Sequence, residues 1–320
     1  MSLKFDPEYA TAAAPIMAIM AQVPKPADHD VETRRSNLKK GIGALLANMP
    51  DFADTETTEH KIKSYDGAEI TVYRIRKIGA EAVPGSAIIH AHGGGMIGGD
   101  AVTFRPGVKA NVSLSGVQFF DVEYRLAPEH PHPALVEDTY AALTWLHEHA
   151  TEFQVDRNRI GVMGESAGGG IAAGVCLMAR DRNLQPPLSK SILVYPMLDS
   201  RNIKPVVKEF DQYLTWTIGS NLTGWTALLG DKLGSDDVSP YASPSHVKSV
   251  EGLPSTYIDV GGLDLFRDEN IEYARRLAAA SIEVEFHLYP GVPHAFEIMA
   301  PEVSVTRQAL ANRIKALKSL

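Results

Sequence analysis

The stretch Gly164-Glu165-Ser166-Ala167-Gly168 decides the fold, because it joins two segments with different periodicities. Residues 159–163 before it are mostly apolar and are bounded by charge, which is typical of a buried strand. Residues 169–174 after it are small and repeat with helical spacing. The sequence therefore predicts a strand, a sharp turn and a helix, with Ser166 at the turn.

A serine in such a turn must adopt a strained backbone conformation, which glycines two residues away on each side permit. The hydroxyl of Ser166 would then stand clear of the sheet, beside the first amides of the helix, where the helix dipole is positive. These features suit a nucleophile. Ordinary glycine-rich turns between a strand and a helix also match the pattern, so other motifs must decide between the two interpretations.

Composition is that of a soluble globular protein with a large core, since 44% of the 320 residues are hydrophobic and 22% are charged. The chain could form one enlarged α/β domain or a domain with an inserted cap. A formal net charge of −8 argues against a nucleic-acid partner. The single cysteine, Cys176, excludes an intramolecular disulfide and argues against a cysteine metal site.

The N-terminal region contains an apolar run, residues 11–23, that could be mistaken for the core of a signal peptide. Asp6 and Glu8 precede this run instead of a basic segment, and the run is too short to span a bilayer. We therefore expect a cytoplasmic protein with no stable membrane insertion.

Helical spacing dominates residues 7–49, with a break at Pro24-Lys25-Pro26, and predicts an N-terminal helical part of a cap over residues 1–55. We expect residues 56–320 to form the main α/β domain. We expect a second cap segment at about 200–239, where no strand pattern occurs, although a long connection with a helix would also fit. Elsewhere strands and helices alternate, which predicts a mainly parallel sheet covered on both faces. The expected strands are 60–64, 69–76, 86–91, 117–124, 159–163, 190–195, 255–260 and 284–289, and the main later helices are 136–149, 266–280 and one from about 301.

The loop after strand 86–91 contains a literal G-x-G-x-x-G at Gly93, Gly95 and Gly98, so a dinucleotide site has to be considered. In such a site the glycines open a helix directly. Here the helical pattern begins only near Thr103, which disfavours that interpretation. Consecutive glycines instead suit a loop whose amides of Gly93 and Gly94 approach a reacting carbonyl oxygen, with the amide of Ala167 as a third donor.

A serine nucleophile needs a base and an acid that orients it. His294 lies in a loop after strand 284–289, at the carboxyl edge of a parallel sheet where ligands bind. Asp264 follows strand 255–260 directly, whereas Asp268 is spaced to lie in the next helix, where the helix dipole already explains an acid. We therefore prefer Asp264. The chain order Ser, Asp, His is that of an α/β-hydrolase.

These motifs resemble the hormone-sensitive-lipase-like branch of the α/β-hydrolases, which includes many bacterial and fungal carboxylesterases. The resemblance covers roughly residues 60–320 and implies an α/β-hydrolase fold with a helical cap. It implies a triad of Ser166, Asp264 and His294, an oxyanion hole of Gly93, Gly94 and Ala167, and no cofactor or metal. Family members often form homodimers through the last strand and helix. The motifs that carry the resemblance are His92–Gly95, Tyr124–Ala134, Gly164–Gly168, Asp264–Glu269 and His294–Phe296.

Several positions differ from the common family pattern. Glu165 and Glu123 stand where Asp is frequent, and Leu265 replaces the Pro of the acid motif. We expect Met96, Leu265 and Phe296 to shape the substrate pocket, so these differences concern the substrate rather than the reaction. Short- to medium-chain acyl or aryl esters are the predicted substrates.

Two alternatives remain open. The same triad could hydrolyse a lactone, a carbamate or an amide, since pocket shape and the placement of the leaving group make that choice. The second alternative is a non-catalytic receptor for a small ligand. Plant gibberellin receptors resemble this family but lack the catalytic histidine. His294 is retained here, which favours an enzyme.

Overall fold

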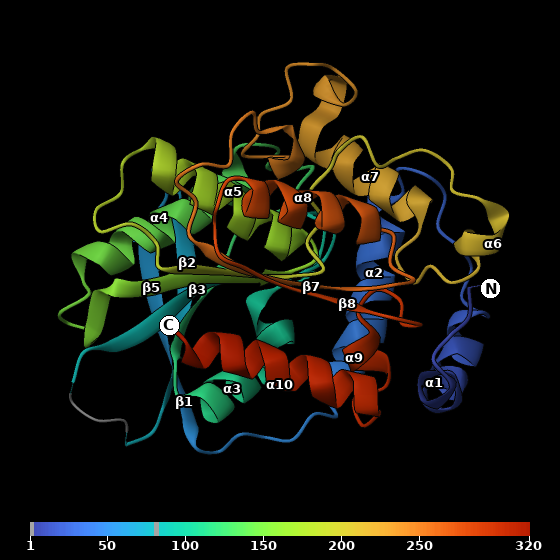
Figure 1. The fold of residues 1–320 in the computed structure, drawn as a ribbon, viewed down its shortest axis with the longest axis horizontal. Helices are drawn as coiled ribbons and strands as arrows, with labels where there is room; N and C mark the ends of the chain where they lie inside the picture. The colour runs from blue at the N-terminus through green and yellow to red at the C-terminus, as the bar shows by residue number, and fades with distance from the viewer. Residues whose placement is uncertain (1–2, 80–82) are drawn as a thin grey trace.

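The computed structural model describes residues 3–79 and 83–320, which contain one eight-stranded sheet with helices on both faces (Figure 1). The strand order is β1-β2-β4-β3-β5-β6-β7-β8. The pairs β1–β2 and β2–β4 are antiparallel and all other pairs are parallel, so the predicted α/β-hydrolase architecture with a mainly parallel sheet is confirmed. The strands are β1 (Thr55–Lys63), β2 (Glu69–Lys77), β3 (Gly85–Ala91), β4 (Gln118–Glu123), β5 (Val155–Glu165), β6 (Lys190–Val194), β7 (Ser255–Gly261) and β8 (Val284–Tyr289).

Two layers of helices cover the sheet. In Figure 1, α3 and α10 lie against one face, and α4, α5 and α8 lie against the other. Strand residues alternate between these layers, because successive side chains of a strand point to opposite faces. Phe119 packs into the α3/α10 side of the core, whereas the next residue, Phe120, packs into the other side. The helices are α1 (Pro7–Met20), α2 (Val31–Leu46), α3 (Ala101–Ser115), α4 (Ala134–Glu148), α5 (Ala167–Asp181), α6 (Lys208–Asp211), α7 (Ile218–Leu229), α8 (Arg267–Ala279), α9 (Phe296–Met299) and α10 (Ser304–Lys318).

The first strand is longer than its sequence pattern predicts. We expected it to begin at His60, but it begins at Thr55 and pairs with β2 along its whole length. The added residues are mostly polar, because β1 lies at the edge of the sheet and is only partly buried. An edge strand therefore hides the apolar alternation on which the prediction depended.

Helix α2 and the residues just before it contact the segment at about 200–239, which holds α6 and α7 among the described residues. The backbone amide of His29 donates a 3.0 Å hydrogen bond to the hydroxyl of Thr223 in α7. The guanidinium of Arg34 in α2 donates to the hydroxyl of Ser220. Two parts of the chain separated by nearly two hundred residues thus lie side by side at the end of the sheet (Figure 1).

Candidate active site

Ser166 occupies the turn between β5 and α5 with φ 58° and ψ −119°, a backbone conformation that L-residues rarely adopt. The neighbouring glycines leave no room for side chains. A Cβ on Gly164 would lie 2.2 Å from the carbonyl oxygen of Gly168, and a Cβ on Gly168 would lie 1.9 Å from that of Ala91. Both glycines are therefore required by close backbone packing, as the sequence predicts.

The side chains of Ser166, His294 and Asp264 form one hydrogen-bonded chain. Nε2 of His294 lies 2.9 Å from Oγ of Ser166, and Nδ1 of His294 lies 2.8 Å from Oδ2 of Asp264. All three side chains are buried. This arrangement places an imidazole nitrogen within reach of the hydroxyl proton and fixes the ring through a carboxylate.

The ring of His294 is held by aromatic neighbours on two sides. Tyr195 and Phe266 meet it edge-on, with ring centroids 4.5 Å and 5.1 Å away. The hydroxyl of Thr215 donates a 2.7 Å hydrogen bond to the backbone carbonyl of His294. The position of the imidazole is thus determined by packing as well as by its two hydrogen bonds.

The two candidate acids lie in different surroundings. Asp264 is fully buried and accepts a 2.8 Å hydrogen bond from the amide of Phe266 on Oδ1, which leaves Oδ2 for the imidazole. The side chain of Asp268 is 78% exposed in α8 and pairs with Arg267 at 2.7 Å. The structure therefore brings Asp264, and not Asp268, to His294.

The glycine loop after β3 folds back on itself beside the serine. The amide of Gly98 donates a 3.0 Å hydrogen bond to the carbonyl of Gly94, whose φ is +132°. A Cβ on Gly93 would lie 3.6 Å from Cβ of Ser166, so the loop directly adjoins the serine turn. Helix α3 begins only at Ala101, after the loop has closed, which supports the donor-loop interpretation over a dinucleotide site.

His92, at the start of this loop, stacks on the ring of Tyr124 with centroids 4.2 Å apart. The hydroxyl of Tyr124 donates a 2.7 Å hydrogen bond to the carbonyl of His92. Burial lowers the pKa of His92. Tyr124 thus holds the first residue of the glycine loop by stacking and by a hydrogen bond.

Three side chains that sequence patterns did not single out also contact the site. Arg35 of α2 donates to the carbonyls of Ile97 and Ala127 and pairs with Glu129. Trp216, just before α7, covers Gly95 so closely that a Cβ there would lie 2.2 Å from the indole. The third is Thr215, whose hydroxyl donates a hydrogen bond to the backbone carbonyl of His294. Arg35 lies in α2, and Thr215 and Trp216 lie between α6 and α7, so only tertiary packing brings them to these loops. Local sequence patterns therefore gave no signal for them.

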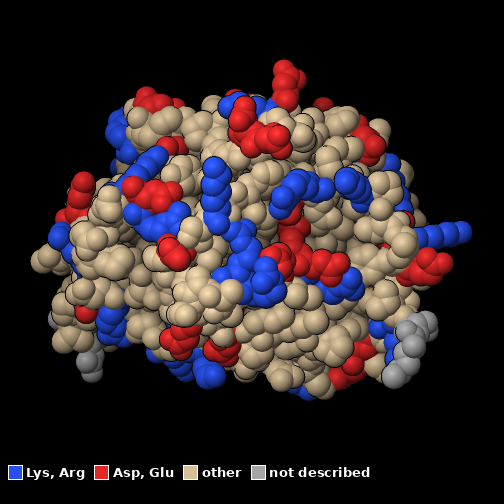
Figure 2. Space-filling view, turned by 45° about the horizontal axis from the view of Figure 1, so that its top comes forward, with Lys and Arg blue, Asp and Glu red and all other residues tan. Residues whose placement is uncertain are grey.

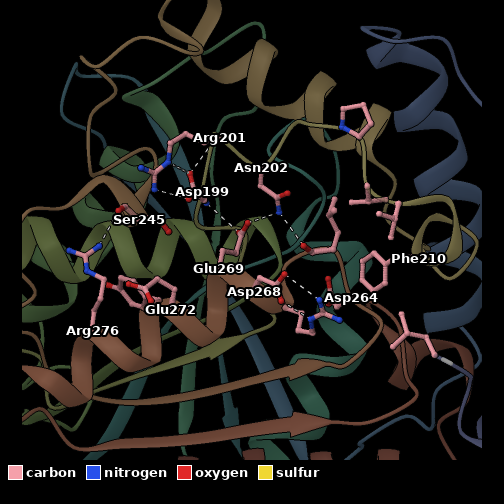
Figure 3. Close-up of a pocket in the computed structure, with 17 residues that line it drawn as sticks. Asp199, Arg201, Asn202, Phe210, Ser245, Asp264, Asp268, Glu269, Glu272 and Arg276 are labelled. Carbon is pink, nitrogen blue, oxygen red and sulfur yellow. Dashed lines mark hydrogen bonds and ion pairs between the residues drawn. The ribbon is translucent and has the colours of Figure 1, made fainter. Parts of the chain in front are cut away.

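A cavity of about 850 Å³ borders the loop that carries Asp264 (Figure 3). Leu265 lines it, and Asn202 donates hydrogen bonds to the carbonyl of Leu265 and to the carboxylate of Glu269, at 3.1 Å and 2.7 Å. The carbonyl of Asn202 in turn accepts a 2.6 Å hydrogen bond from Asn221 of α7. These contacts join the segment around α7 to the acid loop.

The other two predicted pocket residues lie inside packed clusters. Met96 is 1% exposed in the main core, with φ 66° in the middle of the glycine loop. Phe296 is fully buried among Tyr9, Tyr289 and their neighbours. Both side chains therefore belong to the packed interior.

Comparison with known proteins identifies the family. A model of the α/β-hydrolase fold matches residues 88–298. The chain belongs to the α/β-hydrolase fold family. This α/β-hydrolase is 33% identical over 274 residues to the carboxylic ester hydrolase LipN of Mycobacterium tuberculosis, covering 84% of this chain and 71% of LipN. It is 30% identical over 302 residues to the carboxylesterase NlhH of the same organism, covering 90% and 89%.

Solved structures of related α/β-hydrolases superpose on nearly the whole chain. A bacterial heroin esterase matches with a TM-score of 0.87 and 34% identity, over 99% of this chain and 98% of that one. An esterase from Pyrobaculum calidifontis matches with a TM-score of 0.84 and 29% identity, over 99% of each chain. The resemblance to the hormone-sensitive-lipase-like branch is thus confirmed.

Within residues 3–79 and 83–320, no helix of this α/β-hydrolase is long and apolar enough to cross a membrane. The same residues contain no group of three or more His, Cys, Asp or Glu side chains arranged to hold a metal ion. On the face drawn in Figure 2, basic and acidic side chains lie next to one another. Positive and negative charges are therefore mixed on that face.

Proposed function

We propose that the chain hydrolyses short- to medium-chain acyl or aryl esters, with Ser166 as nucleophile, His294 as general base and Asp264 as the group that orients the base. The chain is a carboxylesterase-type hydrolase, in keeping with its relatives. One observation supports the assignment of roles most strongly: His294 contacts the Ser166 hydroxyl through one ring nitrogen and the buried Asp264 through the other.

In the first half of the proposed reaction, His294 takes the proton of Ser166 while the serine oxygen attacks the ester carbonyl carbon. The amides of Gly93, Gly94 and Ala167 donate to the oxygen that becomes negative. The protonated imidazole then gives its proton to the alcohol as the carbon–oxygen bond to the alcohol breaks. An acyl-serine ester remains on the enzyme.

In the second half, His294 removes a proton from water, which attacks the acyl-serine carbonyl with the same amides as donors. Collapse of this intermediate returns the proton to the serine oxygen and releases the acid. Each turnover consumes one water, and the protein's own groups supply every proton transfer. The cycle needs no cofactor or metal ion.

Two residues that lie over the proposed site, Thr215 and Trp216, support a preference for small substrates. Trp216 rests on Gly95 beside the proposed amide donors, and Thr215 binds the loop of His294. We propose that these two residues limit the space above Ser166. We propose that Leu265 contacts substrate from the cavity side. We also propose that Met96 and Phe296 shape the pocket indirectly, by supporting the loops in front of them.

The experiment that tests this function compares wild type with Ser166→Ala on p-nitrophenyl esters of increasing acyl length. A lactone, a carbamate and an anilide are included in the same series. Turnover that requires Ser166 and peaks at short acyl chains supports the esterase. Preferred turnover of the lactone, carbamate or anilide supports the alternative hydrolase, and tight retention of a small ligand without turnover supports a receptor.

Cap, location and partners are further proposals. We propose that residues 1–55 and about 200–239 form one cap, because α2 and α7 contact each other and both reach the glycine loop.

A cytoplasmic location and a small-molecule substrate, with no nucleic-acid partner, fit the sequence. A homodimer through β8 is supported by the position of β8 at the free edge of the sheet, where Leu288 is exposed.

A further inference from the structure

A second group of ionisable side chains lies directly behind the serine turn and has no part in the proposed proton transfers. Nδ1 of His90 lies 2.7 Å from Oδ1 of Asp121, and Nε2 of His90 lies 2.9 Å from Oε2 of Glu165. His90 and Asp121 are almost completely buried, and the side chain of Glu165 is 18% exposed. We call these three residues the His90 cluster.

Both ring nitrogens of His90 face carboxylate oxygens. A neutral imidazole has only one N–H, so one carboxylate would then face a nitrogen lone pair, whereas the imidazolium donates to both. Burial opposes the charge, but Glu165 and Asp121 outweigh it and raise the pKa of His90 to about 10. The pKa of Glu165 is lowered, because His90 and the more distant Arg313 outweigh the effect of burial. Both the geometry and the raised pKa of His90 therefore favour the imidazolium form of this ring.

The cluster spans three neighbouring strands at the edge where the site is built. Asp121 lies on β4, His90 on β3 and Glu165 at the end of β5, and β3 lies between the other two. His90 precedes the glycine loop by two residues, and Glu165 immediately precedes Ser166. The Glu165–His90 hydrogen bond thus joins the strand that carries the amide donors to the strand that carries the nucleophile.

We propose that Glu165 and His90 are positioning residues that hold the glycine loop in register with Ser166; this role rests on the proposed function. Backbone packing at the junction explains why register matters. A Cβ on Gly93 would lie 3.2 Å from the carbonyl oxygen of Glu165, so the loop and the turn are already in contact. A shift of one strand against the other would move the amides of Gly93 and Gly94 relative to the oxygen they are to bind.

The length of the Glu165 side chain is central to this proposal. Glu165→Asp keeps the charge but shortens the side chain by one methylene, so it should lose the contact with Nε2 of His90. Glu165→Gln loses the charge but keeps the length, and its carbonyl oxygen can accept the same hydrogen bond. Both variants retain the His90–Asp121 pair, which avoids leaving Asp121 buried without its partner.

We expect Glu165→Ala and Glu165→Asp to lower kcat by about 10- to 100-fold, because misplacing the reacting groups by about 1 Å can cost that much. KM should change by less than about threefold, because the cluster does not contact substrate. Glu165→Gln should retain most of the wild-type kcat. Glu285→Gln is the matched control, since Glu285 contacts His287 at 3.0 Å on the edge strand β8, away from the site, and should leave kcat unchanged.

Loss of kcat in Glu165→Gln with full activity in Glu165→Asp would overturn the proposal, because charge rather than contact would then matter. Wild-type kcat in Glu165→Ala would overturn it as well. Circular dichroism and a thermal melt of each variant exclude a folding defect as the cause of a loss. Recovery in Glu165→Gln distinguishes positioning from a general structural effect.

A second measurement does not depend on activity. In protein labelled with ¹⁵N-histidine, the His90 ring should carry two protons at pH 8, with its signals assigned by their loss in His90→Asn. A His90 ring with a single proton, carried on Nδ1, would contradict the hydrogen bond from Nε2 to Glu165. If the wild type shows no turnover that depends on Ser166, the proposed function and the catalytic role of the cluster both fail. If the wild type turns over and the Glu165 variants match it, only the present inference fails.

Discussion

The hydroxyl of Thr215 lies 2.7 Å from the backbone carbonyl oxygen of His294 and donates a hydrogen bond to it. Thr215 belongs to the segment between α6 and α7, so this bond connects that segment to the loop that carries the proposed base, His294. We expect Thr215→Val, which keeps the shape and removes the donor, to lower kcat about 3- to 10-fold, as losing one hydrogen bond implies. Thr215→Ser should retain activity, and equal rates for the two variants would contradict this role.

Ser166→Ala and His294→Ala should each reduce turnover by about 10⁶, because a nucleophile and its base act as a unit. The double variant should be no slower than the slower single variant. The measurement is kcat on a p-nitrophenyl ester with background hydrolysis subtracted. Losses that multiply in the double variant would show that the two residues act independently.

Asp264→Asn should lower kcat by roughly 10⁴, since an amide in place of the carboxylate no longer holds the imidazole in the required tautomer. Asp268→Asn should stay close to wild type, because the side chain of Asp268 is exposed and pairs with Arg267. Parallel kinetics of the two variants check the choice of acid. A larger loss in Asp268→Asn would reverse it.

Gly95→Ala should reduce kcat at least about tenfold, because φ is +63° at this position and the new Cβ would meet the indole of Trp216. Gly107→Ala in α3 is the matched control, since among the described residues nothing beyond its chain neighbours and the backbone of its own helix lies within 4 Å of its Cβ position. That control should stabilise the protein by about 0.5–1 kcal/mol. Steady-state kinetics and thermal melts of both variants provide the comparison.

Glu123→Gln should raise Tm at pH 8 and leave it unchanged near pH 4. Burial raises the pKa of Glu123 to about 7 against the opposing amide of Ala101, with Asp100 and Asp121 adding to the rise. The ordinary value in an unfolded chain is about 4.3, so the folded state binds more protons between these values and stability falls as pH rises through them. The exposed Glu152, changed to Gln, should show no such gain.

Strand ends and turns were the parts of the site that could be predicted from sequence. Ser166, Asp264 and His294 each lie just after a strand of a parallel sheet, and such positions meet at one edge whatever the details of packing. The choice between Asp264 and Asp268 followed from the same rule, because only the first lies before the helix begins. The prediction of the candidate site therefore depended mostly on where strands end and helices begin.

Contacts across the fold could not be predicted in this way. His90 lies in a short apolar strand, and nothing in its neighbours indicates that Asp121 and Glu165 will meet its ring from adjacent strands. The contact of Trp216 with Gly95 likewise depends on how a segment without strand pattern folds over the sheet. The added length of β1 was missed because its residues are mostly polar. Each case depends on tertiary neighbours that the local sequence does not specify.

The indole of Trp216 against Gly95 gives this enzyme an intrinsic fluorophore next to the proposed amide donors. The chain has three tryptophans, and one of the others, Trp225, is fully buried in the core. Emission that changes when an acyl or phosphonyl group is attached to Ser166 would thus report on the occupied site in real time. Stopped-flow fluorescence could then separate formation of the acyl-enzyme from its hydrolysis without a chromogenic substrate.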